Sequence, residues 1–71
     1  MPKLPLISGR EAIKVFERMG FQVARQRGSH VVLRRGSHGC VVPKHKELKA
    51  GTLVGILKQA GVSQEDFIEN L

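Results

Sequence analysis

The chain has 71 residues and a formal net charge of +6. It contains three phenylalanines, no tryptophan, no tyrosine and one cysteine. A chain of this length makes one domain with a small core, so we treat residues 1–71 as a single domain. One cysteine excludes an internal disulfide framework, and no apolar run reaches the roughly 18 residues that span a membrane. The N-terminal segment is too short and too broken by proline for a signal peptide, and we expect a soluble cytoplasmic protein.

The first predicted helix runs from residue 9 to about residue 19. Residues 1–7 before it are expected to be extended, because Pro2 and Pro5 disfavour helix in the residues that precede them. Ser8 and Glu11 have the spacing of a capping box, and Gly20 stands where a left-handed residue ends a helix. The apolar residues of this segment recur at helical spacing and form one stripe: Ala12, Ile13, Phe16 and Met19.

Three short strands are predicted next, over residues 21–27, 30–35 and 40–43. Gly28-Ser29 and the Gly-rich residues 36–39 are typical of tight turns between them. In the first strand, alternation places Phe21 and Val23 towards the core. Pro43 ends the third strand or places it at a sheet edge.

The second strand has an alternation that decides where His30 lies. Val31, Leu33 and Arg35 share one face, and His30, Val32 and Arg34 share the other. If Val31 and Leu33 face the helices, His30 faces solvent. In the first strand Arg25 and Arg27 are in register with each other, and the arginines of the hairpin are therefore expected on both of its faces.

Residues 44–49 are predicted to be a polar, basic connection to a second helix over residues 50–60. The inner face of this helix is expected to hold Leu53, Ile56, Leu57 and Ala60. Gly61 ends it, and Ser63 caps a short third helix whose apolar side is Phe67, Ile68 and Leu71. The predicted fold is α+β, in the order α-β-β-β-α with a short C-terminal helix. Three antiparallel strands carry the helices on one face.

The positive charge is concentrated in the middle of the chain. Residues 21–50 hold seven basic and one acidic side chain, whereas residues 51–71 hold one basic and three acidic ones. This distribution favours a polyanionic partner over a merely solvated basic face. Because no aromatic residue is interleaved with the arginines, the pattern indicates recognition of backbone or shape rather than base stacking on the sheet.

Each histidine has a functional and an ordinary interpretation. His30, among arginines, suits a general acid or base in RNA cleavage, although a histidine at the start of a strand is also common. His45 is either a second acid/base or phosphate ligand, or a solvated loop residue. His38 is interpreted as a turn residue.

Metal and cysteine chemistry are disfavoured. His38, Cys40 and His45 have irregular spacing and no C-x-x-C pair, which is a poor metal set. Cys40 has no acidic group placed to orient a Cys–His pair. Of the six carboxylates, five lie in predicted helices, so a two-metal nuclease site is not expected either. We expect neither a metal nor a small-molecule cofactor.

The chain resembles the HicA family of small bacterial toxins over nearly its whole length. The resemblance rests on Gly28-Ser29-His30 opening the second strand and on residues 42–45, Val-Pro-Lys-His, closing the third. It also rests on residues 47–53, Glu-Leu-Lys-Ala-Gly-Thr-Leu, leading into residues 56–61, Ile-Leu-Lys-Gln-Ala-Gly. The resemblance implies a double-stranded-RNA-binding-domain-like fold, with the catalytic histidine at His30. It further implies metal-independent endoribonuclease activity on mRNA, arrest of translation, and a HicB-like antitoxin partner.

The resulting hypothesis is a toxin of a type II toxin–antitoxin system that cleaves mRNA with His30 as acid/base. The RNA-binding residues that we expect are Arg25, Arg27, Ser29, Arg34, Lys44, His45 and Lys46. The second proton-transfer group stays open between His45 and a lysine or arginine. The alternatives are a non-catalytic RNA-binding module of the same fold and an interaction domain whose basic face serves an acidic protein partner.

Overall fold

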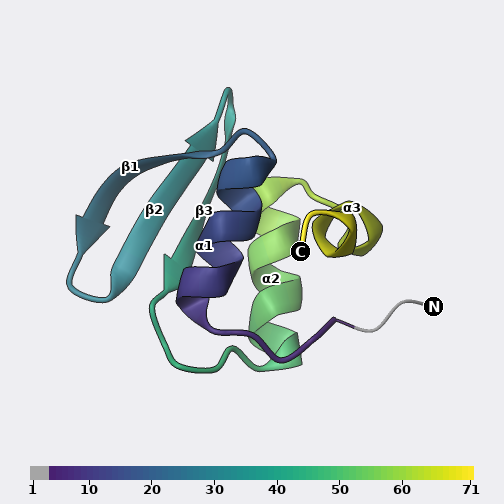
Figure 1. Ribbon diagram of the computed structural model, residues 1–71. Helices are drawn as coiled ribbons and strands as arrows, with labels where there is room; N and C mark the ends of the chain where they lie inside the picture. Colours follow the sequence, from purple (N-terminus) through teal and green to yellow (C-terminus); the bar gives the residue numbers. More distant parts are fainter. Residues whose placement is uncertain (1–3) are drawn as a thin grey trace.

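The computed structural model describes residues 4–71, and the predicted extension of residues 1–3 lies outside the described chain. Six elements follow one another in the order that the sequence predicts (Figure 1): α1 (Gly9–Arg18), β1 (Gln22–Arg27), β2 (His30–Arg35), β3 (His38–Pro43), α2 (Ala50–Ala60) and α3 (Gln64–Glu69). The α+β class, the α-β-β-β-α order and the short C-terminal helix are thereby confirmed.

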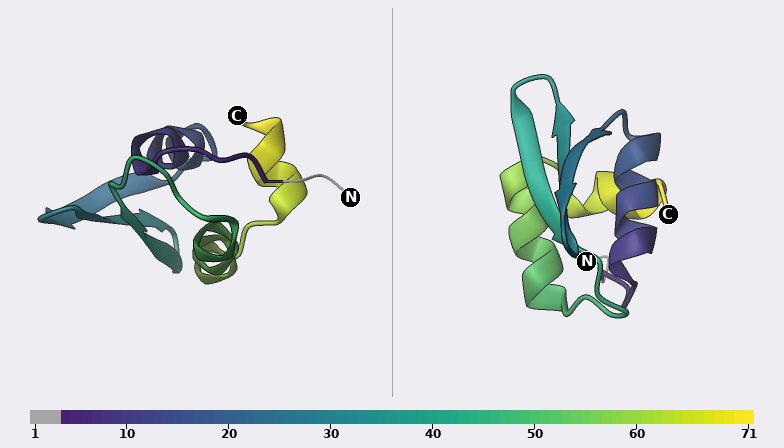
Figure 2. Two further views of the ribbon diagram at one scale, coloured as in Figure 1. Left: turned by 90° about the horizontal axis from the view of Figure 1, so that it is seen from below. Right: turned by 90° about the vertical axis from the view of Figure 1, so that its left-hand side faces the viewer.

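The three strands form one antiparallel sheet in the order β1-β2-β3, so that β1 and β3 are the edges. The helices pack on one face of the sheet. The right-hand view of Figure 2 looks onto the other face, and no helix of the described chain crosses it. We call this surface the open face.

Helix α1 forms where its capping box and apolar stripe predict it. Ser8 Oγ accepts from the Glu11 amide at 3.1 Å, and Glu11 Oε1 accepts from the Ser8 amide at 3.0 Å. These two bonds satisfy amides that a helix N-terminus leaves without partners. Phe16 is fully buried and its ring centroid lies 5.2 Å from that of Phe21 and 5.3 Å from that of Phe67. The three aromatic rings thus join α1, the start of the sheet and α3 in one core.

Helix α2 has the predicted bounds, and its four predicted core residues are all buried. Helix α3 begins after Ser63, whose Oγ accepts from the Asp66 amide at 3.1 Å. The predicted apolar side of α3 is only partly right: Phe67 is buried, Ile68 is half-buried, and Leu71 is 51% exposed. Leu71 lies beyond the end of the helix at Glu69, so helical spacing does not direct it to the core.

Strand β3 starts two residues earlier than predicted. It runs from His38 because the turn after β2 consists of Gly36-Ser37, and Arg35 pairs directly with His38. The glycines that suggested a longer loop belong in part to the strand: Gly39 pairs with Arg34.

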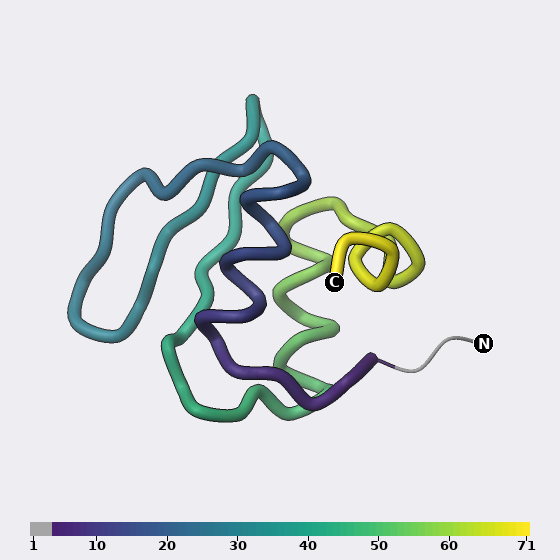
Figure 3. Tube along the Cα trace, in the orientation of Figure 1, coloured from purple at the N-terminus to yellow at the C-terminus, as the bar shows by residue number. Residues whose placement is uncertain are grey.

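The connection between β3 and α2 was predicted to be polar and basic, but it also contains a core residue. Leu48 within it is buried, with 1% exposure. Ile7 and Leu48 form an isolated antiparallel bridge, in which the Leu48 amide donates to Ile7 O at 2.7 Å. Figure 3 shows this connection running beside the segment that precedes α1. The bridge fixes the basic loop of residues 44–49 against the body of the domain.

Candidate nucleic-acid interface

The turn Gly28-Ser29 delivers the chain to His30 with a fixed backbone. Gly28 has φ +54°, in the left-handed region that glycine adopts without steric cost. Gln26 Nε2 donates to Gly28 O at 2.9 Å, and the Lys44 amide donates to Ser29 O at 2.6 Å. The turn is therefore held from both sides, by the strand before it and by the end of β3.

His30 lies on the open face, as the alternation of β2 predicts. Val31 and Leu33 are buried with 1% and 0% exposure, so the side chains at 30, 32 and 34 point to the other side of the sheet. His30 pairs directly with Arg27 on β1 and with Pro43 on β3, and its side chain is exposed. Side chains of directly opposite residues lie on the same face, about 5 Å apart at Cβ.

A β-bulge in β1 brings two arginines onto the same face as His30. The register shifts between Val23, which pairs with Leu33, and Arg25, which pairs with Val32. The extra residue, Ala24, breaks the alternation, so residues that simple alternation assigns to the core side turn outward. Arg25 and Arg27 thus share a face, as predicted, and the hairpin arginines lie on both faces because Arg35 is on the helix side.

The prediction that Val23 packs in the core is wrong for a reason other than the bulge, since Val23 pairs with the buried Leu33 and therefore stays on the helix side of the sheet. Val23 is 47% exposed, and every residue of β1 is exposed. In Figure 1 this edge of the sheet reaches away from the helices, which leaves β1 with little to pack against.

The open face is a grid of three rows set by the register of the three strands. His30 is flanked by Arg27 and Pro43, Val32 by Arg25 and Val41, and Arg34 by Gln22 and Gly39. The grid carries three guanidinium groups and one imidazole. The six carboxylates of the chain all lie elsewhere: Glu11 and Glu17 on α1, Glu47 in the loop, and Glu65, Asp66 and Glu69 on α3. The open face is therefore positive and free of competing carboxylates.

The fourth hairpin arginine, Arg35, has a structural role on the helix side. Its Nη1 donates to Met19 O at 2.8 Å, and its guanidinium carbon lies 4.6 Å from the centroid of the Phe21 ring. Cation–π contacts of this geometry contribute about 0.5–1 kcal/mol at exposed sites. Arg35 thus joins the end of α1 to β2 and is directed away from the open face.

The loop residues expected to bind RNA border the open face rather than belonging to it. Lys44 Nζ donates to Gln26 Oε1 at 3.4 Å, and Gln26 pairs with the buried Val31, so Lys44 lies on the helix side of the sheet, across it from His30. Ser29, His45 and Lys46 are exposed beside this end of the sheet.

A close backbone contact positions the His45 segment. The Gly9 amide donates to His45 O at 2.8 Å. A Cβ at Gly9 would lie 2.8 Å from Lys44 Cα and 2.9 Å from Pro43 C, closer than real Cβ atoms approach other atoms. Only glycine at the start of α1 permits this approach, a requirement that the sequence prediction did not include.

Cys40 and the remaining histidine belong to the packing of the domain. Cys40 is 4% exposed, and burial raises the pKa of its thiol from 9.0 to about 11, which keeps it protonated near neutral pH. His38 starts β3, and its ring lies against Gly61, where an added Cβ would be 2.8 Å from His38 Cδ2. Within residues 4–71, no three His, Cys, Asp or Glu side chains are grouped as metal ligands would be.

In the part of the chain that the structure describes, no helix is long and apolar enough to cross a membrane. A search among curated proteins and a search among solved structures find no match. The family model described as "HicA toxin of bacterial toxin-antitoxin" matches residues 9–62. The match extends from the start of α1 through the sheet and α2 to the residue after Gly61, and membership in this family implies a cognate antitoxin. The chain therefore belongs to the HicA toxin family of bacterial toxin–antitoxin systems.

Proposed function

We propose that this toxin is an endoribonuclease that cleaves mRNA in the cytoplasm and so blocks translation, with His30 as its acid/base group. The observation that carries the proposal is the position of His30 on an open face with Arg25, Arg27 and Arg34 and without a carboxylate. Such a surface attracts a phosphodiester backbone and places a proton-transfer group beside it.

The chemistry is the attack of a ribose 2′-oxygen on its own 3′-phosphate. His30 takes the 2′-OH proton as the bond from O2′ to phosphorus forms and the bond from phosphorus to O5′ breaks. The products are a 2′,3′-cyclic phosphate and a 5′-OH end, and the leaving oxygen needs a proton from a second group. The arginine guanidiniums stabilise the negative charge that develops on the phosphate oxygens.

The bordering loop supplies further contacts and the candidates for the second proton donor. Ser29, Lys44, His45 and Lys46 lie at the end of the sheet where His30 begins β2. Among these, Lys44, His45 and Lys46 carry groups that can donate a proton to the leaving oxygen. Lys44 would have to turn away from Gln26 to reach the face that carries His30, whereas the backbone of His45 is held by Gly9.

A second function, RNA binding without cleavage, is favoured by one observation. Of the nine residues of the open face, His30 is the one histidine and the others are arginine, glutamine or residues without an acid/base side chain, so the grid itself offers no second general acid. In this alternative the same arginines bind RNA and no bond breaks.

For either function, a HicB-like antitoxin would neutralise the toxin by covering the open face with an acidic surface.

The two functions are separated by incubating wild-type protein with labelled single-stranded mRNA in the presence of a chelator. The enzyme proposal predicts fragments that end in a 2′,3′-cyclic phosphate. Intact RNA that binds with a steep dependence on salt would support the non-cleaving module instead. If the protein has no RNA affinity at low salt, the result would support the third hypothesis, in which the basic face binds an acidic protein partner.

The arginines are tested by the salt dependence of binding. For single-stranded nucleic acid the logarithm of the binding constant changes by about −0.7 per phosphate contact for each tenfold rise in salt. Arg25→Gln and Arg27→Gln should each reduce that slope by about 0.7. Arg10→Gln on the exposed surface of α1 is the matched control, because it removes the same charge away from the open face.

A further inference from the structure

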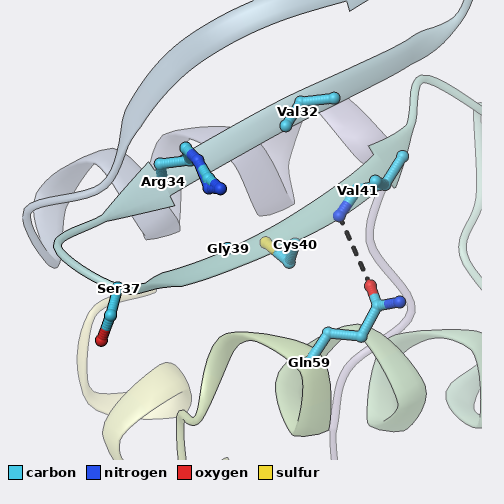
Figure 4. Close-up of a pocket in the computed structure, with 7 residues that line it drawn as sticks. All are labelled: Val32, Arg34, Ser37, Gly39, Cys40, Val41 and Gln59. Carbon is cyan, nitrogen blue, oxygen red and sulfur yellow. Dashed lines mark hydrogen bonds between the residues drawn. The ribbon is translucent and has the colours of Figure 1, made fainter.

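A hollow at the edge of β3 extends the open face towards α2. It has a volume of about 370 Å³, and Figure 4 shows it between β2, β3 and the side chain of Gln59. Its lining residues are Val32, Arg34, Ser37, Gly39, Cys40, Val41 and Gln59. Gly39 contributes no side chain to the hollow, and an added Cβ there would lie 3.2 Å from Leu33 O and 3.6 Å from Arg34 Cγ.

The hollow combines an apolar surface with directional hydrogen-bonding groups. Val32 and Val41 pair directly across β2 and β3, and Val41 is 39% exposed. Gln59 reaches from α2 to the strand edge, where its Oε1 accepts from the Val41 amide at 3.5 Å. A carboxamide presents one acceptor and two donors, and the guanidinium of Arg34 offers a flat cationic surface beside them. No carboxylate lines the hollow.

We propose that this hollow binds one unpaired base of the RNA strand whose phosphates lie on the arginines of the open face. The inference rests on the proposed RNA-binding function and assigns it a position of base recognition. The base packs against Val32 and Val41, the Arg34 guanidinium covers its exposed side, and the Gln59 amide contacts its hydrogen-bonding edge. Proteins recognise single-stranded RNA by holding splayed bases in this way. The volume lies at the small end of ligand sites, which suits a base rather than a larger ligand.

The edge of β3 is less suited to a strand from a protein partner. Strand addition needs a row of free amides and carbonyls along an edge. Here the Val41 amide already has a partner in Gln59, and Pro43, at the end of the strand, has no amide hydrogen. Gly39 and Val41 leave too short an edge for a ladder, and the position beside Arg34 favours a group that continues from a phosphate backbone.

The test measures base preference in binding, using His30→Ala protein so that cleavage does not interfere. Fluorescence anisotropy would compare oligoadenylate, oligouridylate and oligocytidylate of about ten residues, a length that covers a small single-strand site. We expect a preference for one base of about three- to tenfold, the scale of one or two hydrogen bonds. Gln59→Leu, which keeps the size of the side chain and removes its amide, should abolish the preference. Gln64→Leu, the same change at an exposed position of α3, should retain it.

The outcomes separate this inference from the proposed function. Equal affinity for the three oligonucleotides, or a uniform loss with Gln59→Leu, would overturn the base site even if the wild-type protein cleaves RNA. In that case the hollow would be left to a protein partner. A base preference that depends on Gln59 would support the site even if the wild-type protein proved not to cleave. Failure to bind all three oligonucleotides would overturn both.

Discussion

Gly9 gives the most discriminating test of how the loop beside His30 is held in place. Gly9→Ala would introduce a Cβ 2.8 Å from Lys44 Cα, in a place bounded by backbone atoms rather than by flexible side-chain ends. The loop would have to move, and the bond from the Gly9 amide to His45 O would be lengthened or lost.

The size of the effect follows from three contributions. Overpacking costs about 1–3 kcal/mol, and a lost hydrogen bond costs about 1 kcal/mol. The higher helix propensity of alanine opposes these by at most about 1 kcal/mol. We therefore expect Gly9→Ala to lower the free energy of unfolding by about 1–3 kcal/mol, which corresponds to a fall in Tm of about 5–20 °C for a domain of this size.

The matched control is Gly55→Ala in α2, where an added Cβ meets nothing within 4 Å. Here the propensity gain is not opposed, and the variant should be more stable by about 0.5–1 kcal/mol. Thermal unfolding followed by circular dichroism measures both variants. If Gly9→Ala were as stable as Gly55→Ala, the close packing of α1 on the 43–45 backbone would be refuted.

Three further predictions concern the sheet. Val23→Thr should change the free energy of unfolding by less than about 0.5 kcal/mol, whereas Val31→Thr should cost about 1–3 kcal/mol in chemical denaturation; equal costs would contradict the exposed position of Val23 on the edge strand. Arg35→Gln should lower stability by about 1–2 kcal/mol through loss of the Met19 and Phe21 contacts and should leave the salt dependence of RNA binding unchanged; a reduced salt slope would place Arg35 in the RNA interface. The raised pKa of Cys40 favours the neutral thiol in the folded state, so the stability that this thiol contributes is complete below pH 9 and is lost as the pH rises from 9 to about 11. The free energy of unfolding of the wild type should therefore fall over this pH range, and that of Cys40→Ala should not show this fall. The same pH dependence in both proteins would contradict the burial of the thiol.

The elements of this fold are predictable from local pattern because their signals are local. Ser8 and Ser63 cap their helices through bonds to residues three positions away, and the four apolar residues of α2 follow helical spacing. The position of His30 on the open face follows from two neighbours, Val31 and Leu33, that alternation places in the core.

The errors concern features that depend on distant partners. The sequence around Ala24 does not indicate a bulge, because the extra residue is defined by how β1 pairs with β2. Leu48 lies between charged residues and is buried only because it bridges to Ile7, about forty positions earlier. The need for glycine at position 9 likewise arises from its contact with the backbone of residues 43–45.

The candidate site shows the same division. The turn and the strand alternation predict where His30 points. The grouping of Arg25 and Arg27 with it, and the placement of Lys44 on the opposite side of the sheet, required the register and the hydrogen bond to Gln26.

The central claim is that His30 transfers a proton during RNA cleavage, and His30→Ala tests it most directly. His30 is exposed and its side chain makes no core contact, so the variant should keep the thermal stability of the wild type within about 0.5 kcal/mol. Single-turnover cleavage of labelled mRNA should then fall by at least about a hundredfold, the scale of general acid–base catalysis, while RNA affinity stays within a few fold. A folded His30→Ala protein that cleaves at the wild-type rate would contradict the account.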